Sequence, residues 1–133
     1  MRAKLGLLGA CVLVAVAVPV FAHHSFDAEF DRSKPVSLKG TVTKLEWMNP
    51  HVWVYMDVTD ASGKIVNWQC ENGAPNMLKR AGWNRESIKQ GDIITIDGSL
   101  AKDGSNTCNA TTLVLANGTK VFAGSSGGNG KAK

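Results

Sequence analysis

The sequence predicts an all-β domain with one short helix. Apolar residues recur at every second position in several segments, which is typical of half-buried strands. Clusters of glycine, asparagine, aspartate and proline separate these segments, as turns do. A single segment near the middle of the chain carries helix start and stop signals instead.

The first alternating segment begins at Val36 and indicates a long, bent strand. Its alternation shifts by one residue when it reaches Leu45 and Trp47, so we expect a β-bulge near residues 43–44. Asn49-Pro50 then breaks the strand, because proline cannot donate a ladder hydrogen bond.

The next two strands form a hairpin. The second strand is expected over residues 51–58, with its valines and Met56 on one face. Residues 60–63, Asp-Ala-Ser-Gly, form the turn, and the third strand follows over residues 64–71.

The predicted helix lies between the third and fourth strands. Pro75 suits the first helical position and Gly82 the residue after the last, so the helix spans residues 75–81. Strands over residues 93–100 and 107–115 and a short extra strand over 119–122 complete the chain. The resulting order, β-β-β-α-β-β with a bent first strand, predicts an OB-fold-like five-stranded barrel over residues 35–123. An open β-sandwich is the alternative.

The amino-terminal residues 1–22 have the three parts of a secretory signal peptide. Arg2 and Lys4 precede an apolar run over residues 5–20, and Val20-Phe21-Ala22 resembles a cleavage site. An uncleaved anchor and a lipoprotein modified at Cys11 are the alternatives. Cleavage after Ala22 predicts a periplasmic or secreted protein with no membrane span in the mature chain.

The expected mature chain has 111 residues, enough for one domain with a modest core. A polar lead-in over residues 23–34 precedes the barrel, and the Gly/Ser-rich residues 124–133 are expected to be disordered. The mature part carries 13 basic and 11 acidic residues. With no concentrated basic face, we expect no nucleic-acid partner.

Two cysteines, Cys70 and Cys108, remain after cleavage. In an exported protein this number favours one disulfide, with a reduced buried pair as the alternative. The third and fifth strands of the predicted barrel are neighbours, which favours contact between the two cysteines, but the register of a parallel pair would separate them unless one strand slides.

Five motifs distributed over the mature chain resemble a family of short exported proteobacterial proteins catalogued as a domain of unknown function. They are Ala22-His23-His24-Ser25-Phe26, Leu38-Lys39-Gly40-Thr41-Val42, Trp47-Met48-Asn49-Pro50-His51-Val52-Trp53, Gly82-Trp83 and Ala101-Lys102-Asp103-Gly104-Ser105. The resemblance implies a periplasmic location and no particular activity or cofactor.

Three histidines form a candidate metal site. Cleavage after Ala22 would free the α-amino group of His23, which can chelate a metal together with its own imidazole. His51 or His24 would complete a three-nitrogen set, which suits copper. The alternative is that these residues are polar side chains with no metal, His51 bonding a turn.

Aromatic residues on the second and third strands form a candidate ligand face. Trp53 and Tyr55 alternate with the valine face, and Trp68 lies on the third strand. Barrels of this kind bind ligands across these strands, and exposed aromatics stack on rings or sugars. The alternative is that the lead-in aromatics Phe26 and Phe30, or the helix, cover this face.

Signals for catalysis are weak. No serine lies in a nucleophile-elbow context, no phosphate-binding loop is present, and Glu71 is interpreted as an ion-pair partner of Arg80. The sequence therefore favours a non-enzymatic periplasmic binding or accessory module, with a small ligand or a periplasmic protein as partner. A copper-binding or copper-handling protein is the alternative.

Overall fold

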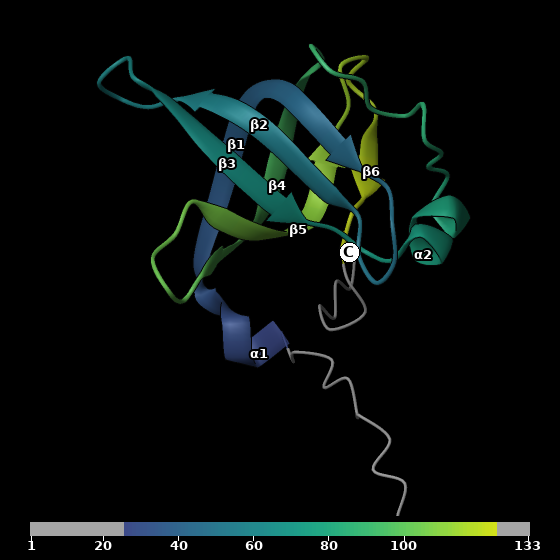
Figure 1. The fold of residues 1–133 in the computed structure, drawn as a ribbon, viewed down its shortest axis with the longest axis horizontal. Coiled ribbons are helices and arrows are strands. Elements are labelled where there is room, and N and C mark those ends of the chain that lie inside the picture. The colour runs from purple at the N-terminus through teal and green to yellow at the C-terminus, as the bar shows by residue number, and fades with distance from the viewer. Residues whose placement is uncertain (1–25, 125–133) are drawn as a thin grey trace, which may run out of the picture.

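The computed structural model describes residues 26–124 (Figure 1). The proposed signal peptide, His23, His24 and residues 125–133 of the proposed tail lie outside this range. The elements, in chain order, are α1 (Phe26–Glu29), β1 (Phe30–Glu46), β2 (Trp53–Thr59), β3 (Ile65–Glu71), α2 (Pro75–Arg80), β4 (Ile93–Ala101), β5 (Thr107–Val114) and β6 (Lys120–Phe122). The all-β class with a short helix between the third and fourth strands is confirmed.

The strands form one sheet in the order β3-β2-β1-β4-β5-β6, and neighbours in this order are antiparallel. In addition, β3 pairs with β5 in parallel over three residues, Gln69 to Glu71. Strands β1 to β5 therefore form a continuous circuit of pairs. In Figure 1, β2 and β3 cross the front of the molecule, α1 lies below them and α2 lies to the right.

Strand β1 is bent and begins earlier than the alternation indicated. The register of β1 against β2 shifts between Val42 and Lys44, where a bulge was expected. The strand begins at Phe30, six residues before Val36, because a second register shift between Asp31 and Pro35 interrupts the alternation. The expected polar lead-in thus supplies the first turn of helix and the first residues of the sheet.

The core lies inside the circuit of strands. Val52, Val54 and Met56 are almost completely buried, so β2 turns this face inward, as its alternation predicted. After α2, Trp83 is buried in the core, and its indole Nε1 donates a hydrogen bond to the Phe122 carbonyl oxygen at 3.0 Å.

Strands β4 and β5 approach closely at Gly98. A Cβ at this position would lie 2.1 Å from the carbonyl oxygen of Asn109, too close for any side chain. The register of β4 against β5 shifts between Asp97 and Gly98, so the glycine permits the irregular pairing at this point.

Cys70 and Cys108 form a disulfide. They are register partners in the parallel β3–β5 pair, with their Cα atoms 4.6 Å apart. The bridge therefore joins two strands that are separated by 38 positions in the sequence. Within residues 26–124, no helix has the length and apolar character needed to cross a membrane.

Candidate functional site: hollows on the outer face of β2, β3 and β5

The outer face of the sheet carries two rows of side chains across three strands. Because inward residues of β2 alternate with outward ones, Trp53 and Tyr55 point outward. Their register partners on β3 and β5 share this face. The rows are Trp53, Glu71 and Asn109, and then Tyr55, Gln69 and Thr107.

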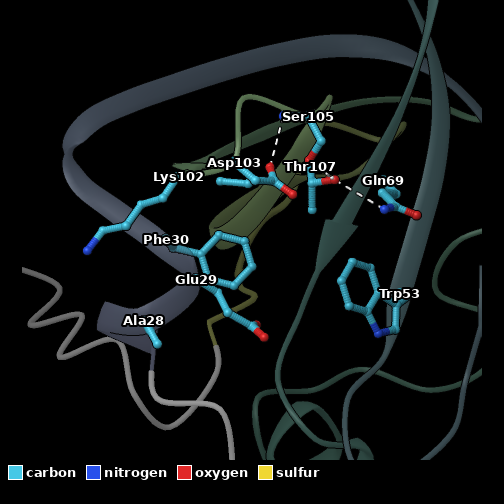
Figure 2. Close-up of a pocket in the computed structure, with 10 residues that line it drawn as sticks. Ala28, Glu29, Phe30, Trp53, Gln69, Lys102, Asp103, Ser105 and Thr107 are labelled. Atoms are coloured by element: carbon cyan, nitrogen blue, oxygen red, sulfur yellow. Dashed lines mark hydrogen bonds between the residues drawn. The ribbon is translucent and has the colours of Figure 1, made fainter.

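A hollow of about 590 Å³ lies over this face, between α1 and the β4–β5 turn (residues 102–106). We call it the large hollow. Figure 2 shows Phe30, Glu29 and Trp53 around the space, with the turn above it. Its ten lining residues are Ala28, Glu29, Phe30, Trp53, Gln69, Ala101, Lys102, Asp103, Ser105 and Thr107.

A second hollow of about 240 Å³, the small hollow, continues along β3. It shares Gln69, Ser105 and Thr107 with the large hollow. Its other lining residues are Tyr55, Asn67, Trp68 and Asn106. The two hollows are therefore adjacent, with Trp53 bordering the first and Tyr55 the second.

Hydrogen bonds organise the residues that the two hollows share. The Thr107 hydroxyl oxygen accepts one bond from Gln69 Nε2 at 3.1 Å and another from the Ser105 hydroxyl at 2.9 Å. The backbone nitrogen of Ser105 donates to Asp103 Oδ1 at 2.9 Å. Hydrogen bonds from Ser105 lower the pKa of Asp103, so this carboxylate is ionised at neutral pH.

Lys102 joins the β4–β5 turn to α1. Its backbone nitrogen donates to the Glu29 carbonyl oxygen at 2.8 Å, and its Nζ donates to the Asp27 carbonyl oxygen at 2.6 Å. The side chain extends away from the large hollow in Figure 2. The single cation among the ten lining residues is thus engaged with backbone outside the space.

The three predicted ligand-face aromatics occupy different faces. Trp53 and Tyr55 are half-buried on the outer face, and the Tyr55 hydroxyl donates to Glu46 Oε2 at 3.0 Å. Trp68 is the register partner of Met56, so it points inward and packs partly against the core, while also bordering the small hollow.

His51 contacts Glu71 at the end of β3. Its Nδ1 lies 2.5 Å from Glu71 Oε1, and the glutamate is only 6% exposed. Burial, and to a lesser degree the charge of Glu29, raises the pKa of Glu71 to about 7. The interpretation of Glu71 as a partner of Arg80 missed this contact. The sequence did contain a signal for this contact. Glu71 directly follows the core cysteine Cys70, and a charged residue at such a position needs a nearby partner.

The predicted copper ligands are only partly within the described range. Among residues 26–124, no group of three or more histidine, cysteine, aspartate or glutamate side chains is placed to hold a metal. His51 is described, whereas His23 and His24 are not. Copper binding therefore stays a prediction.

The model of a family of unknown function (DUF6152) matches residues 10–110. No curated protein matches the chain.

Proposed function

The chain belongs to the family of unknown function DUF6152, and we propose that it is a non-enzymatic binding module whose ligand occupies the large hollow. The observation that carries this proposal is the half-buried Trp53 beside about 590 Å³ of space. Known small-molecule sites have this volume, an aromatic wall and a few polar groups that fix orientation.

The residues around the large hollow favour an uncharged ligand. Gln69, Ser105 and Thr107 supply amide and hydroxyl groups, and the Lys102 ammonium is engaged elsewhere. An anionic ligand would meet the carboxylates of Glu29 and Asp103, which repel it.

The pairing pattern supports an OB-type barrel. Five strands in a circuit, with a helix between the third and fourth, have the arrangement of that fold. OB folds bind ligands over strands two and three beside the loop between strands four and five. The large hollow lies over the corresponding elements, β2, β3 and residues 102–106.

Export to the periplasm is part of the proposal. The charged start, apolar run and Val20-Phe21-Ala22 junction support cleavage after Ala22. The Cys70–Cys108 disulfide suits an oxidising compartment.

The test is a small-molecule screen by thermal shift on the correctly cleaved chain, followed by calorimetry on each hit. We expect uncharged hits, and Trp53→Ala to weaken their binding at least about tenfold, because an aromatic anchor is lost. Lys39→Ala is the matched control, since Lys39 is exposed on β1 and borders neither hollow. Hits that bind Trp53→Ala and the natural chain equally would contradict the proposal.

A second candidate function, copper binding, is favoured by the orientation of His51. Histidines that bind metals commonly direct one ring nitrogen to a carboxylate and the other to the metal. The contact of His51 Nδ1 with Glu71 Oε1 corresponds to the carboxylate contact of such histidines.

The position of α1 also supports this candidate. Glu29 of α1 and Trp53 both border the large hollow, and Trp53 is the register partner of Glu71. In the sequence, His24 precedes the first residue of α1 by two positions. The α-amino group and ring of His23 with His51 or His24 would then supply three nitrogens.

Calorimetry and electron paramagnetic resonance with Cu(II) test this candidate. The correctly cleaved chain should bind one equivalent through nitrogen ligands, and His51→Ala should weaken binding by at least about tenfold. A chain with methionine before His23 is the control, because it blocks the terminal chelate. No bound copper at equimolar supply would exclude the candidate.

A further inference from the structure

The two hollows form one track along the outer face. They share three residues, and each has its own aromatic residue from β2. Trp53 and Tyr55 are two positions apart on one strand, which places their Cα atoms roughly 6.6 Å apart. A ligand made of repeated rings can therefore place successive units against successive aromatic residues.

The polar side chains of the track are mainly neutral. Asn67, Gln69, Ser105, Asn106 and Thr107 carry amides and hydroxyls, which donate and accept hydrogen bonds. Thr107 is only 8% exposed, and its oxygen already accepts two hydrogen bonds, so its remaining capacity is to donate its proton. A ligand hydroxyl is a suitable acceptor for that proton.

The charges of the track exclude a polyanion. Glu29 and Asp103 border the large hollow, and Lys102 is bonded to the Asp27 carbonyl oxygen. A single-stranded nucleic acid would need cations along its phosphates. Hydroxyl groups, in contrast, donate hydrogen bonds to carboxylates.

The Tyr55 ring is held in position. Its hydroxyl donates to Glu46 at 3.0 Å, and the Lys44 ammonium lies over the ring, 5.1 Å from the centroid. A ring fixed by its neighbours loses little conformational entropy when a ligand packs against it.

We propose that the track binds a linear, uncharged oligosaccharide of at least two rings, one ring unit beside Trp53 and the next beside Tyr55. This inference rests on the proposed binding function and adds the ligand class and a second subsite. The neutral hydrogen-bonding groups and the two aromatic residues match hydroxylated rings, and the nearby ammonium groups of Lys102 and Lys44 are engaged by the Asp27 carbonyl oxygen and by Glu46.

The test is calorimetry on the cleaved chain with glucose, N-acetylglucosamine and their α-1,4- and β-1,4-linked oligomers. The favoured oligomer should bind at least about tenfold more tightly than its monomer. Tyr55→Ala should reduce the advantage of the oligomer over the monomer to less than about twofold, whereas Trp53→Ala should weaken the binding of both at least about tenfold. Tyr55→Phe is the matched control, because it keeps the ring. Circular dichroism and thermal unfolding show whether Tyr55→Ala is folded.

The possible outcomes separate the two proposals. If monomer and oligomer bind with equal affinity, or if Tyr55→Ala binds the oligomer as tightly as the natural chain does, the proposed second subsite is wrong. The proposed binding function of the large hollow is unaffected by either result. Binding of a non-saccharide ligand or a single-stranded oligonucleotide, with no saccharide bound, overturns the ligand class. If no ligand of any class binds, both proposals fail.

Discussion

His51 Nδ1 lies 2.5 Å from Glu71 Oε1, so an imidazole contacts an almost fully buried carboxyl group. A charged histidine would favour the carboxylate, while burial and Glu29 favour the protonated acid. The pKa of Glu71 lies at about 7, against an ordinary value of 4.5. The Glu71 carboxyl group therefore changes its charge near neutral pH.

The stability of the protein should fall as the pH rises toward neutrality. Between pH 4.5 and 7 the folded state keeps a proton on Glu71 that the unfolded state has lost, so folding is favoured at low pH. This contribution, up to about 3 kcal/mol, is lost as the pH rises through 7. Urea unfolding at pH 5, 6, 7 and 8 measures it.

Glu71→Gln should remove this pH dependence, because glutamine does not titrate. Glu46→Gln is the matched control, since hydrogen bonds from Lys44 and Tyr55 lower the pKa of Glu46. Any contribution of Glu46 to the pH dependence of stability therefore lies at acid pH and not between pH 5 and 8. A slope between pH 5 and 8 that is the same in Glu71→Gln and the natural chain would contradict the assignment.

Reduction of the disulfide should destabilise the fold. The Cys70–Cys108 bridge closes a loop of 38 positions, and the loss of such a constraint costs about 2–4 kcal/mol. Urea unfolding with and without dithiothreitol measures the difference. Cys70→Ala and the double variant Cys70→Ala/Cys108→Ala should resemble the reduced protein, and neither should respond to reductant; unchanged stability on verified reduction would count against the bridge.

Phe30→Ala should destabilise the protein by about 3–4 kcal/mol, because its ring is 4% exposed and its backbone pairs with Ala101. Phe26→Ala is the matched control: its ring contacts Phe30 at 5.6 Å between centroids but is half-exposed, so its loss should be smaller. Thermal and urea unfolding compare the two. Equal losses of stability in the two variants would contradict the deeper burial of Phe30.

Gly98→Ala should destabilise by about 1–3 kcal/mol, because the added methyl group meets the backbone of Asn109 and β4 must separate from β5. Ser99→Ala, at the next position of β4, should change stability by less than about 0.5 kcal/mol. Urea unfolding measures both, and a Gly98→Ala variant as stable as Ser99→Ala would refute the close approach.

Local patterns in the sequence predicted much of the fold. The alternation of Val52, Val54 and Met56 predicted which face of β2 is buried, and the phase shift before Leu45 predicted the bulge in β1. Pro75 and Gly82 bracketed the helix that the structure has over Pro75–Arg80. Each of these features depends on neighbours within a few residues, so the sequence carries it directly.

The candidate site was predictable only in part. The outward direction of Trp53 and Tyr55 followed from alternation, whereas Trp68 turned inward because its register partner is Met56. The start of β1 at Phe30 was missed, because the polar residues after it break the alternation.

The sequence by itself therefore determined the strands, the turns and the chemistry of the side chains available to a site. Only the tertiary structure decided that β3 lies against β5, that Cys70 meets Cys108, and that His51 meets Glu71. The two hollows also required it, since their walls come from α1, β2, β3 and the β4–β5 turn. The physical reason is that the apolar alternation of a strand determines which of its faces is buried. Which distant strand it pairs with follows from the packing of the whole circuit of strands.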